Sequence, residues 1–214
     1  MNLKYLTRND LPEIMALQHI VYKMLEDKEV LQTLNEDEFE EIIDQGFIVG
    51  TCEQHELVGI RAMYIPPVNY EEHLADDAEI TEKDKVIFSE ISFINPGHRG
   101  RRLQTRMGEE LIEKVKKDGR FDYILTTVMP NNLASLKDKF RLGFKIVKTA
   151  YKYNGKKRHI LQLNLKAPLT ISGEAKKVHF AKTDWMLKNS EYYIGDRLED
   201  NHIHYYEREQ TEQS

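Results

Sequence analysis

The sequence has a single cysteine, Cys52, and little proline or glycine, six and eleven residues among 214. One cysteine excludes an intramolecular disulfide and a cysteine-rich zinc site, and it is typical of a protein in a reducing compartment. Few chain breakers, with 40% hydrophobic and 31% charged residues, exclude collagen-like and largely disordered chains. No apolar run reaches the roughly 20 residues that cross a bilayer, and the first residues lack the apolar core of a signal peptide. We therefore expect a soluble, cytoplasmic protein with one main core.

Basic residues are also in deficit, because 31 lysines and arginines face 36 aspartates and glutamates, for a net charge of -5. The overall field of such a chain does not attract phosphate backbones or anionic lipid surfaces. Nucleic acids and membranes are therefore disfavoured as partners. The most biased segment is acidic: residues 71–84 hold seven carboxylates and one lysine, in what we expect to be a long loop.

Hydrophobic periodicity and turn residues predict alternating strands and helices. Helices are expected from about Asp10, after Asn35, from about Leu103 to Gly119, and from about Asn132. The polar turn 53–56 and the pair Asn154-Gly155 each indicate a hairpin. This order favours a mixed α/β sheet. The expected strands are 1–6, 47–52, 57–65, 86–94, 123–128, 145–151 and 159–165.

A run of arginines lies where a predicted strand ends and a predicted helix begins. After Asn95 the chain carries Arg99, Gly100, Arg101 and Arg102 in succession. The first amides of a helix have no partner within the helix, and the helix dipole adds positive charge there, so this order suits a pyrophosphate. Glycine allows a close backbone approach, and arginines add charge-assisted contacts. Alone, the pattern also fits a solvated basic surface, and it matches neither three-glycine nor Gly-Lys-Ser/Thr nucleotide motifs.

Two motifs, Pro96–Gln104 and the pair Asn132–Ser135 with Leu142–Phe144, together resemble the signatures of the GNAT acetyltransferase superfamily, over about residues 1–165. The segment Pro96–Gln104 resembles its acyl-CoA loop, commonly Pro-x-x-Arg-Gly-x-Gly followed by an apolar residue and Gly, Ala or Gln. Some thirty residues later, Asn132–Ser135 and Leu142–Phe144 resemble an Asn-x-x-Ser/Ala helix that ends in Gly-Phe. The resemblance implies an α/β fold with a mixed, largely antiparallel splayed sheet flanked by helices. It also implies that acetyl-CoA enters between the fourth and fifth strands.

The resemblance further implies which residues hold acetyl-CoA, with no metal involved. Backbone groups of the loop would bind the pyrophosphate, and the strand before it would pair with pantetheine. Asn132, the first residue of the second motif, would form a hydrogen bond with pantetheine or on the side from which the amine attacks. The family's second glycine is Arg102 here, a departure of small cost if that residue has helical geometry. The expected cofactor-binding residues are Phe93, Ile94, Asn95, Arg99, Gly100, Arg101, Arg102, Leu103, Gln104, Asn132 and Ser135.

Three residues are the candidates for catalysis in the activity that the resemblance implies, transfer of an acetyl group from acetyl-CoA to a primary amine. Direct attack of a neutral amine on a thioester needs a base or water chain and donors for the oxyanion. Glu90, on the strand before the loop, is the expected general base; otherwise it is an ordinary exposed or paired carboxylate. Lys139, four residues before Gly143, stands where relatives often have the tyrosine that protonates the thiolate; otherwise it is a solvated helix cation. Tyr151 is a further candidate acid or a wall of the groove.

The acceptor is expected to be an amine on a small molecule or peptide. In the resembled family, the connection that contains residues 71–84 borders the acceptor groove, and its carboxylates would raise the local concentration of cations. A cationic acceptor is therefore favoured, although acidic loops also serve solubility alone. One other function stays open: a catalytically weak CoA-binding or regulatory module, suggested by Arg102 and Lys139. A nucleic-acid-binding protein that uses the arginine cluster is disfavoured by the acidic balance and by the place of the cluster at an expected cofactor site.

A C-terminal extension, residues 166–214, lies beyond the resemblance. It is rich in aromatic residues, which indicates that it packs on the core or on a partner subunit, so that a homodimer is one arrangement to expect. Val178–Phe180 is predicted to be a strand, and Thr183–Trp185 to begin a helix.

Overall fold

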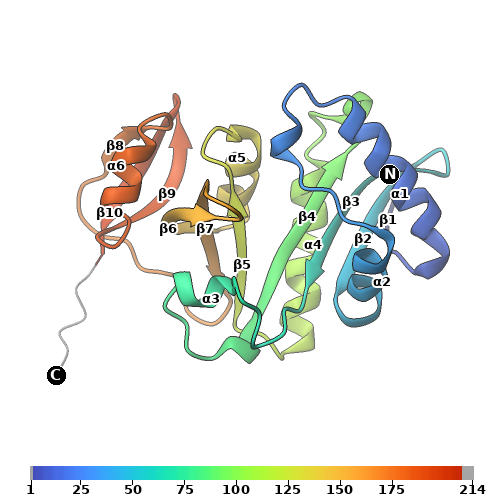
Figure 1. Cartoon of the computed structure of the whole chain (residues 1–214), viewed down its shortest axis with the longest axis horizontal. Coiled ribbons are helices and arrows are strands. Elements are labelled where there is room, and N and C mark those ends of the chain that lie inside the picture. The colour runs from blue at the N-terminus through green and yellow to red at the C-terminus, as the bar shows by residue number, and fades with distance from the viewer. Residues whose placement is uncertain (1, 209–214) are drawn as a thin grey trace. The chain divides into compact units, whose positions relative to one another are not determined.

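The structure, a computed structural model, describes residues 2–208, and the chain divides into two compact units. Unit 1 consists of Met1–Pro67 and Ile87–Phe121, and unit 2 of Val68–Val86 and Asp122–Ser214. Figure 1 labels the helices and strands of both. The end of the expected extension, residues 209–214, lies outside the described residues.

Unit 1 is built on an antiparallel sheet whose strand order is β1–β2–β3–β4. The predicted polar turn joins β2 to β3: Gln54 and His55 have positive φ angles of 49° and 71°, as a two-residue hairpin turn requires. The elements are β1 (Asn2–Tyr5), α1 (Leu11–Lys23), α2 (Glu36–Gln45), β2 (Phe47–Glu53), β3 (Glu56–Tyr64), β4 (Val86–Ile94) and α4 (Leu103–Asp118).

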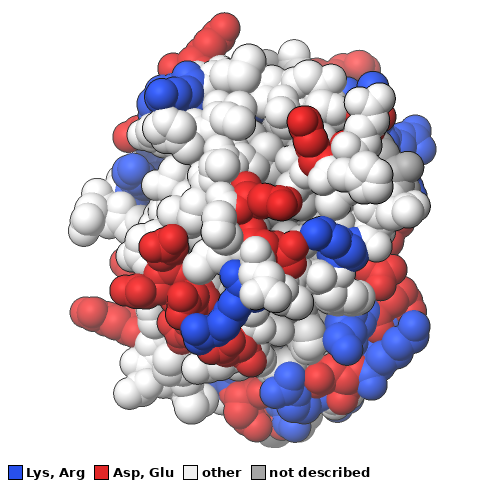
Figure 2. All heavy atoms as spheres, turned by 90° about the vertical axis from the view of Figure 1, so that its right-hand side faces the viewer, with Lys and Arg blue, Asp and Glu red and all other residues white. Residues whose placement is uncertain are grey.

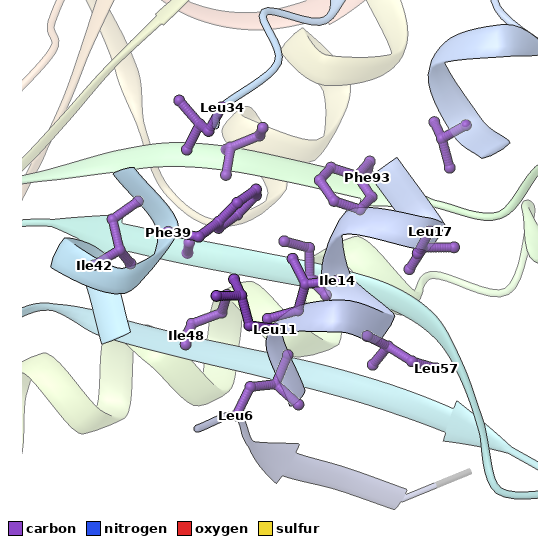
Figure 3. Packing of buried hydrophobic residues seen from close by; sticks show 14 residues of the cluster. Leu6, Leu11, Ile14, Leu17, Leu34, Phe39, Ile42, Ile48, Leu57 and Phe93 are labelled. Atoms are coloured by element: carbon purple, nitrogen blue, oxygen red, sulfur yellow. The ribbon is translucent and has the colours of Figure 1, made fainter. Parts of the chain in front are cut away.

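The core of unit 1 lies between this sheet and the helices α1 and α2 (Figure 3). Both helices begin where the sequence predicts, with Pro12 in the first turn of α1 and Asn35 as the N-cap of α2. The Glu38 N–H donates to Asn35 Oδ1 at 3.0 Å. Each fully buried aliphatic side chain stabilises the fold by about 1.5–3 kcal/mol. Figure 3 labels Leu6, Leu11, Ile14, Leu17, Leu34, Phe39, Ile42, Ile48, Leu57 and Phe93.

The opposite face of this sheet carries α4. Ile60 and Ala62 of β3 belong to the core beneath α1 and α2, so Arg61 between them points to the other face. There its guanidinium donates to the carbonyl oxygen of Gln104 at 3.0 Å. Gly119, at φ +76°, ends α4 as predicted.

Unit 2 is built on a second antiparallel arrangement, ordered β5–β7–β6–β9–β10–β8. The predicted hairpin between β6 and β7 is confirmed, with positive φ angles of 61° and 83° at Asn154 and Gly155. The elements are α3 (Leu74–Asp77), β5 (Tyr123–Val128), α5 (Leu133–Arg141), β6 (Lys145–Lys152), β7 (Lys156–Asn164), β8 (Lys176–His179), α6 (Thr183–Lys188), β9 (Tyr193–Glu199) and β10 (His202–Glu207).

The extension continues the strands of unit 2. The predicted strand and helix are confirmed as β8 and α6, whereas the β9–β10 hairpin is an addition to the prediction. β9 pairs with β6 through Ile146 and Gly195, where a Cβ on the glycine would lie 3.1 Å from the Cβ of Ile146. The ring of Trp185 lies 5.3 Å from that of Tyr193 and 5.4 Å from that of Tyr205. The aromatic residues of the extension therefore pack on one another as well as beside β6.

The acidic segment 71–84 is partly neutralised within unit 2. Asp76 Oδ1 lies 2.7 Å from Lys83 Nζ. Asp77 Oδ2 lies 2.9 Å from Lys152 Nζ at the end of β6, and both of these side chains are largely buried. The negative potential of this segment is therefore weaker than its seven carboxylates alone predict.

Charges of both signs lie among each other on the face shown in Figure 2. Several ion pairs of unit 1 also join opposite charges, such as Arg8 Nη1 with Glu40 Oε2 at 2.8 Å. Among the described residues drawn on this face, no broad basic patch of the kind that binds a phosphate backbone is visible.

Candidate functional site

The candidate loop leaves β4 through a fixed turn at Asn95. The Asn95 N–H donates to the carbonyl oxygen of Val58 at 2.8 Å, and its Oδ1 accepts from the Gly97 N–H at 3.1 Å. A short 3-10 turn, Pro96–His98, follows. The start of the loop is thus held to β3, which sets its direction toward α4.

The backbone of the loop turns through two left-handed residues before α4 begins. Gly100 has φ +80°, and an added Cβ there would meet nothing within 4 Å. Arg102, the N-cap of α4, has φ 56° and ψ 25°. From the sequence, we expect replacement of the glycine by Arg102 to cost little if this residue has right-handed helical geometry, and it does not. A left-handed backbone costs a residue with a side chain about 1–2 kcal/mol. The first helical hydrogen bond runs from the Arg106 N–H to Arg102 O at 3.0 Å, so the amides of Leu103 and Gln104 precede it.

Arg102→Gly is expected to stabilise the protein by about 0.5–1 kcal/mol, because glycine adopts this backbone without strain but loses more entropy on folding. Chemical denaturation of the full chain measures the change. Arg101→Gly is the matched control in the same loop: Arg101 does not have a positive φ, so its replacement should not stabilise. A lower free energy of unfolding for Arg102→Gly than for the unchanged chain would contradict the strain.

The cations of this loop are not all equally available. His98 Nε2 lies 2.8 Å from Glu53 Oε2, and Arg101 Nη1 lies 2.9 Å from Glu53 Oε1, so one carboxylate at the end of β2 holds both. Arg99 and Arg102 are exposed. The amides that open α4, the open space at Gly100 and these two exposed arginines fit a pyrophosphate.

Glu90 occupies a β-bulge in β4. On β3, Ala62 pairs with Ile91 and the next residue, Met63, pairs with Ser89, so Glu90 is the extra residue. Bulges re-aim side chains and are over-represented next to active sites. Two adjacent polar residues, Ser89 and Glu90, interrupt the alternation of β4, and this is the signal by which the sequence could have revealed the bulge.

Glu90 is an exposed residue, yet neighbouring protein atoms keep water from part of its carboxyl group. Desolvation, and secondarily repulsion by Glu38 of α2, raise its pKa from 4.5 to about 7. Glu38 lies in the first turn of α2, so the acidic start of this helix contributes to the raised pKa of Glu90. A carboxylate with a pKa near neutrality is suited to accept a proton at physiological pH.

The expected pantetheine-binding strand presents only some of its backbone groups. Because the Asn95 N–H reaches Val58, and Phe93 pairs with Ile60, the alternation of an antiparallel strand directs the N–H and C=O of Ile94 away from β3. The side chain of Phe93 lies in the core (Figure 3). Of the three residues expected here, Ile94 is the one whose backbone does not face β3.

The second motif builds the two ends of α5 in unit 2. Asn132 is the N-cap, and its Oδ1 accepts from the Ser135 N–H at 3.1 Å. At the other end, Gly143 has φ +90° and the Phe144 N–H donates to Lys139 O at 3.0 Å. The motif is therefore at least a pair of helix caps.

The two other catalytic candidates differ sharply in exposure. Lys139 is buried, 5% exposed, with its Nζ 5.8 Å from the ring centre of Phe144. The alternative of a solvated helix cation is therefore wrong, because a solvated side chain would be exposed. Burying an ammonium group also requires compensating contacts. Tyr151, on β6, is 59% exposed and reaches water freely.

Two charged residues that contact the loop were not predicted from the sequence. Glu53 pairs with His98 and Arg101, which lie 45 and 48 positions later in the sequence, and nothing in the sequence indicates pairs so far apart. Arg61 did leave one, because it is a lone charge within the apolar strand Leu57–Tyr64. Within residues 2–208, no group of three or more His, Cys, Asp or Glu side chains is placed to hold a metal ion. Nor is any helix in that range long and apolar enough to cross a membrane.

Comparison with known proteins identifies the architecture. No protein-family model matches the chain, and no curated protein does. Solved structures do match: yncA from Salmonella typhimurium, solved with its cofactor acetyl-CoA, has 14% identity and a TM-score of 0.58 over 81% of this chain and 98% of its own. A GNAT-family acetyltransferase from Streptococcus pneumoniae has 14% identity and a TM-score of 0.55 over 76% and 98% of the two chains. The chain has the GNAT acetyltransferase fold.

Another similar solved structure contains a second bound molecule besides coenzyme A. An aminoglycoside acetyltransferase, in complex with coenzyme A and kanamycin, has 18% identity and a TM-score of 0.57 over 77% of this chain and 95% of its own. At such identities the similarity establishes the GNAT fold and leaves the acceptor open. The fold class inferred from the resemblance, with helices flanking a largely antiparallel sheet, is confirmed.

Proposed function

We propose that this protein is an acetyl-CoA-dependent N-acetyltransferase that acts on a primary amine of a small molecule or peptide. The observation that carries the proposal is Glu90: a carboxyl group on a β-bulge, with a pKa of about 7, on the strand that leads into the loop proposed here to bind the pyrophosphate. A carboxylate of this pKa can take the proton of an attacking amine.

In the proposed site, residues of this chain bind acetyl-CoA and accept the proton of the amine. The amides of Leu103 and Gln104, with Arg99 and Arg102, would hold the pyrophosphate, while Gly100 would admit it closely. The backbone of Ile94 would pair with pantetheine. When bound, acetyl-CoA supplies the activated acetyl group. Glu90 would accept the proton released by the amine.

For three residues of unit 2, we propose roles that each leave two alternatives. Asn132 Oδ1 caps α5, so its side-chain amide would be the group that bonds pantetheine or the acceptor. The proton for the leaving thiolate would come from Lys139 or Tyr151. Tyr151 is 59% exposed and Lys139 only 5%, so Tyr151 is the more accessible of the two and is favoured.

A cationic amine is the proposed acceptor class. The carboxylates of residues 71–84 support it, although ion pairs offset some of their charge. The kanamycin complex of the aminoglycoside acetyltransferase also supports an amino-rich acceptor. A CoA-binding module without efficient catalysis is the second candidate, favoured by the strained Arg102 and the buried Lys139 at positions where relatives often have glycine and tyrosine.

The deciding experiment measures acetyl-CoA binding and turnover together. Acetyl-CoA at 100 times its Kd should stabilise the folded chain by about 2.7 kcal/mol, seen as a raised Tm. Thiol release should then depend on the amine, in a panel of a polyamine, an aminoglycoside, a lysine peptide and a neutral amine. Rates with the cationic acceptors should fall with added salt, because exposed charges are screened over about 10 Å at 0.1 M. A raised Tm without amine-dependent thiol release would support the binding module instead.

A further inference from the structure

A buried arginine on β3 has no part in the roles proposed above. Arg61 is 0% exposed. Its Nη1 donates to the carbonyl oxygen of Gln104 at 3.0 Å, and its Nη2 lies 3.4 Å from Ser89 Oγ on β4. All of these residues belong to unit 1. The guanidinium thus joins the middle of the sheet to the first turn of α4.

Burial of this charge is costly, and stability alone does not explain it. Moving a guanidinium out of water costs several kcal/mol before its contacts are counted, and arginine does not avoid the cost by losing its proton. An apolar side chain of similar volume, such as methionine, often serves a buried position as well or better. The charge therefore points to a role beyond packing.

The position of the contact indicates that role. Gln104 is the second residue of α4, and its carbonyl belongs to the same turn whose first amides face the candidate loop. A donor that grips this carbonyl fixes the orientation of the turn, and its charge adds to the positive end of the helix dipole. The rigid guanidinium fork can contact the turn and β4 at once, which the single ammonium of a lysine cannot do with the same geometry.

We infer that Arg61 is a positioning residue that orients the first turn of α4 toward the pyrophosphate of an acyl-CoA donor. The inference rests on the proposed function. It assigns to this residue a part in selecting a nucleotide-bearing donor, through the backbone of α4 and without contact to the donor. Arg61 should consequently matter for donors that carry a pyrophosphate and not for those that lack one.

The test compares two donors with the full chain: acetyl-CoA, which has the pyrophosphate, and acetyl-pantetheine, which lacks it. In Arg61→Met, the ratio of kcat/KM for acetyl-CoA to kcat/KM for acetyl-pantetheine should fall at least tenfold, because only acetyl-CoA uses the amides of the first turn. Arg61→Lys keeps the charge and loses the fork, so its ratio should lie between those of Arg61→Met and the unchanged chain. Arg106→Met, at an exposed arginine of the same helix, is the matched control and should keep the original ratio.

Equal losses for both donors in Arg61→Met, or no loss for either, would overturn the inference. If Arg61→Met does not fold, Arg61→Lys carries the same comparison, and an unchanged ratio in that folded variant overturns it. An unchanged chain that uses neither donor contradicts the proposed function instead, so the two failures are distinguishable.

Discussion

Gly100→Pro is expected to abolish acetyl-CoA binding while the chain stays folded. Proline fixes φ near -65°, whereas Gly100 has φ +80°, so the loop between β4 and α4 cannot keep its course. The change also removes one backbone N–H from the proposed pyrophosphate site. Calorimetric titration with acetyl-CoA measures the loss, which we expect to exceed 100-fold in Kd. Arg101→Ala should weaken binding only slightly, because Glu53 already holds that side chain.

Gly173→Pro is the matched control for this change. Gly173 also has φ +80° and open space around its Cβ position, but it lies in the connection between β7 and β8, outside the proposed site. Both substitutions impose the same backbone conflict, so they should lower the Tm by similar amounts. Only Gly100→Pro should lose acetyl-CoA. Normal binding by a folded Gly100→Pro chain would remove the loop from the proposed site.

Glu90→Gln is expected to lower kcat by roughly 100-fold or more with the Kd for acetyl-CoA preserved. Glutamine keeps the size and hydrogen-bonding capacity of the side chain but cannot accept a proton. Steady-state kinetics, with acetyl-CoA binding measured separately, check both parts. A kcat within threefold of the original would exclude Glu90 as the general base.

The pH dependence of the rate gives an independent check on Glu90. A base with a raised pKa is protonated and inactive at low pH, so kcat/KM of the unchanged chain should rise with pH up to about 7. Glu38→Gln removes the like charge but keeps the helix cap, because glutamine also accepts from the Asn35 N–H. In that variant the rise should occur at lower pH, though still above 4.5, since desolvation remains. A profile that Glu90→Gln leaves unchanged would contradict the assignment.

Most of the fold follows from local sequence because its signals are short-range. Asn35 caps α2, Gly119 ends α4, and the turn at Asn154 closes a hairpin, each through contacts within a few residues. The β9–β10 hairpin escaped prediction although Asp200 and Asn201 form its turn with positive φ. Its strands mix charged and aromatic residues, so their alternation of apolar and polar residues is weak.

The candidate site was less predictable because its decisive features depend on tertiary structure. The left-handed φ of Arg102 is imposed by the path from β4 to α4, since arginine itself disfavours it. Lys139 is buried, and its Nζ lies 5.8 Å from the ring centre of Phe144, a contact made only once the chain has turned at the end of α5. The bulge at Glu90 is a matter of register between β3 and β4. Sequence patterns thus located the catalytic candidates but not their environments.

The pairing of β9 with β6 bears on how this chain behaves if it is shortened. A chain that ends near residue 165, where the resemblance to the acetyltransferases ends, would lack β9, so one edge of β6 would be open. That edge would also lose the ion pair of Lys145 with Asp196 and the hydrogen bond from the Arg208 guanidinium to the Val147 carbonyl oxygen. Open strand edges offer N–H and C=O groups to other molecules and promote self-association. We therefore expect the extension to protect this edge of β6 from self-association. Gly195 is small enough for β9 to pair there, because a Cβ on it would lie 3.1 Å from the Cβ of Ile146.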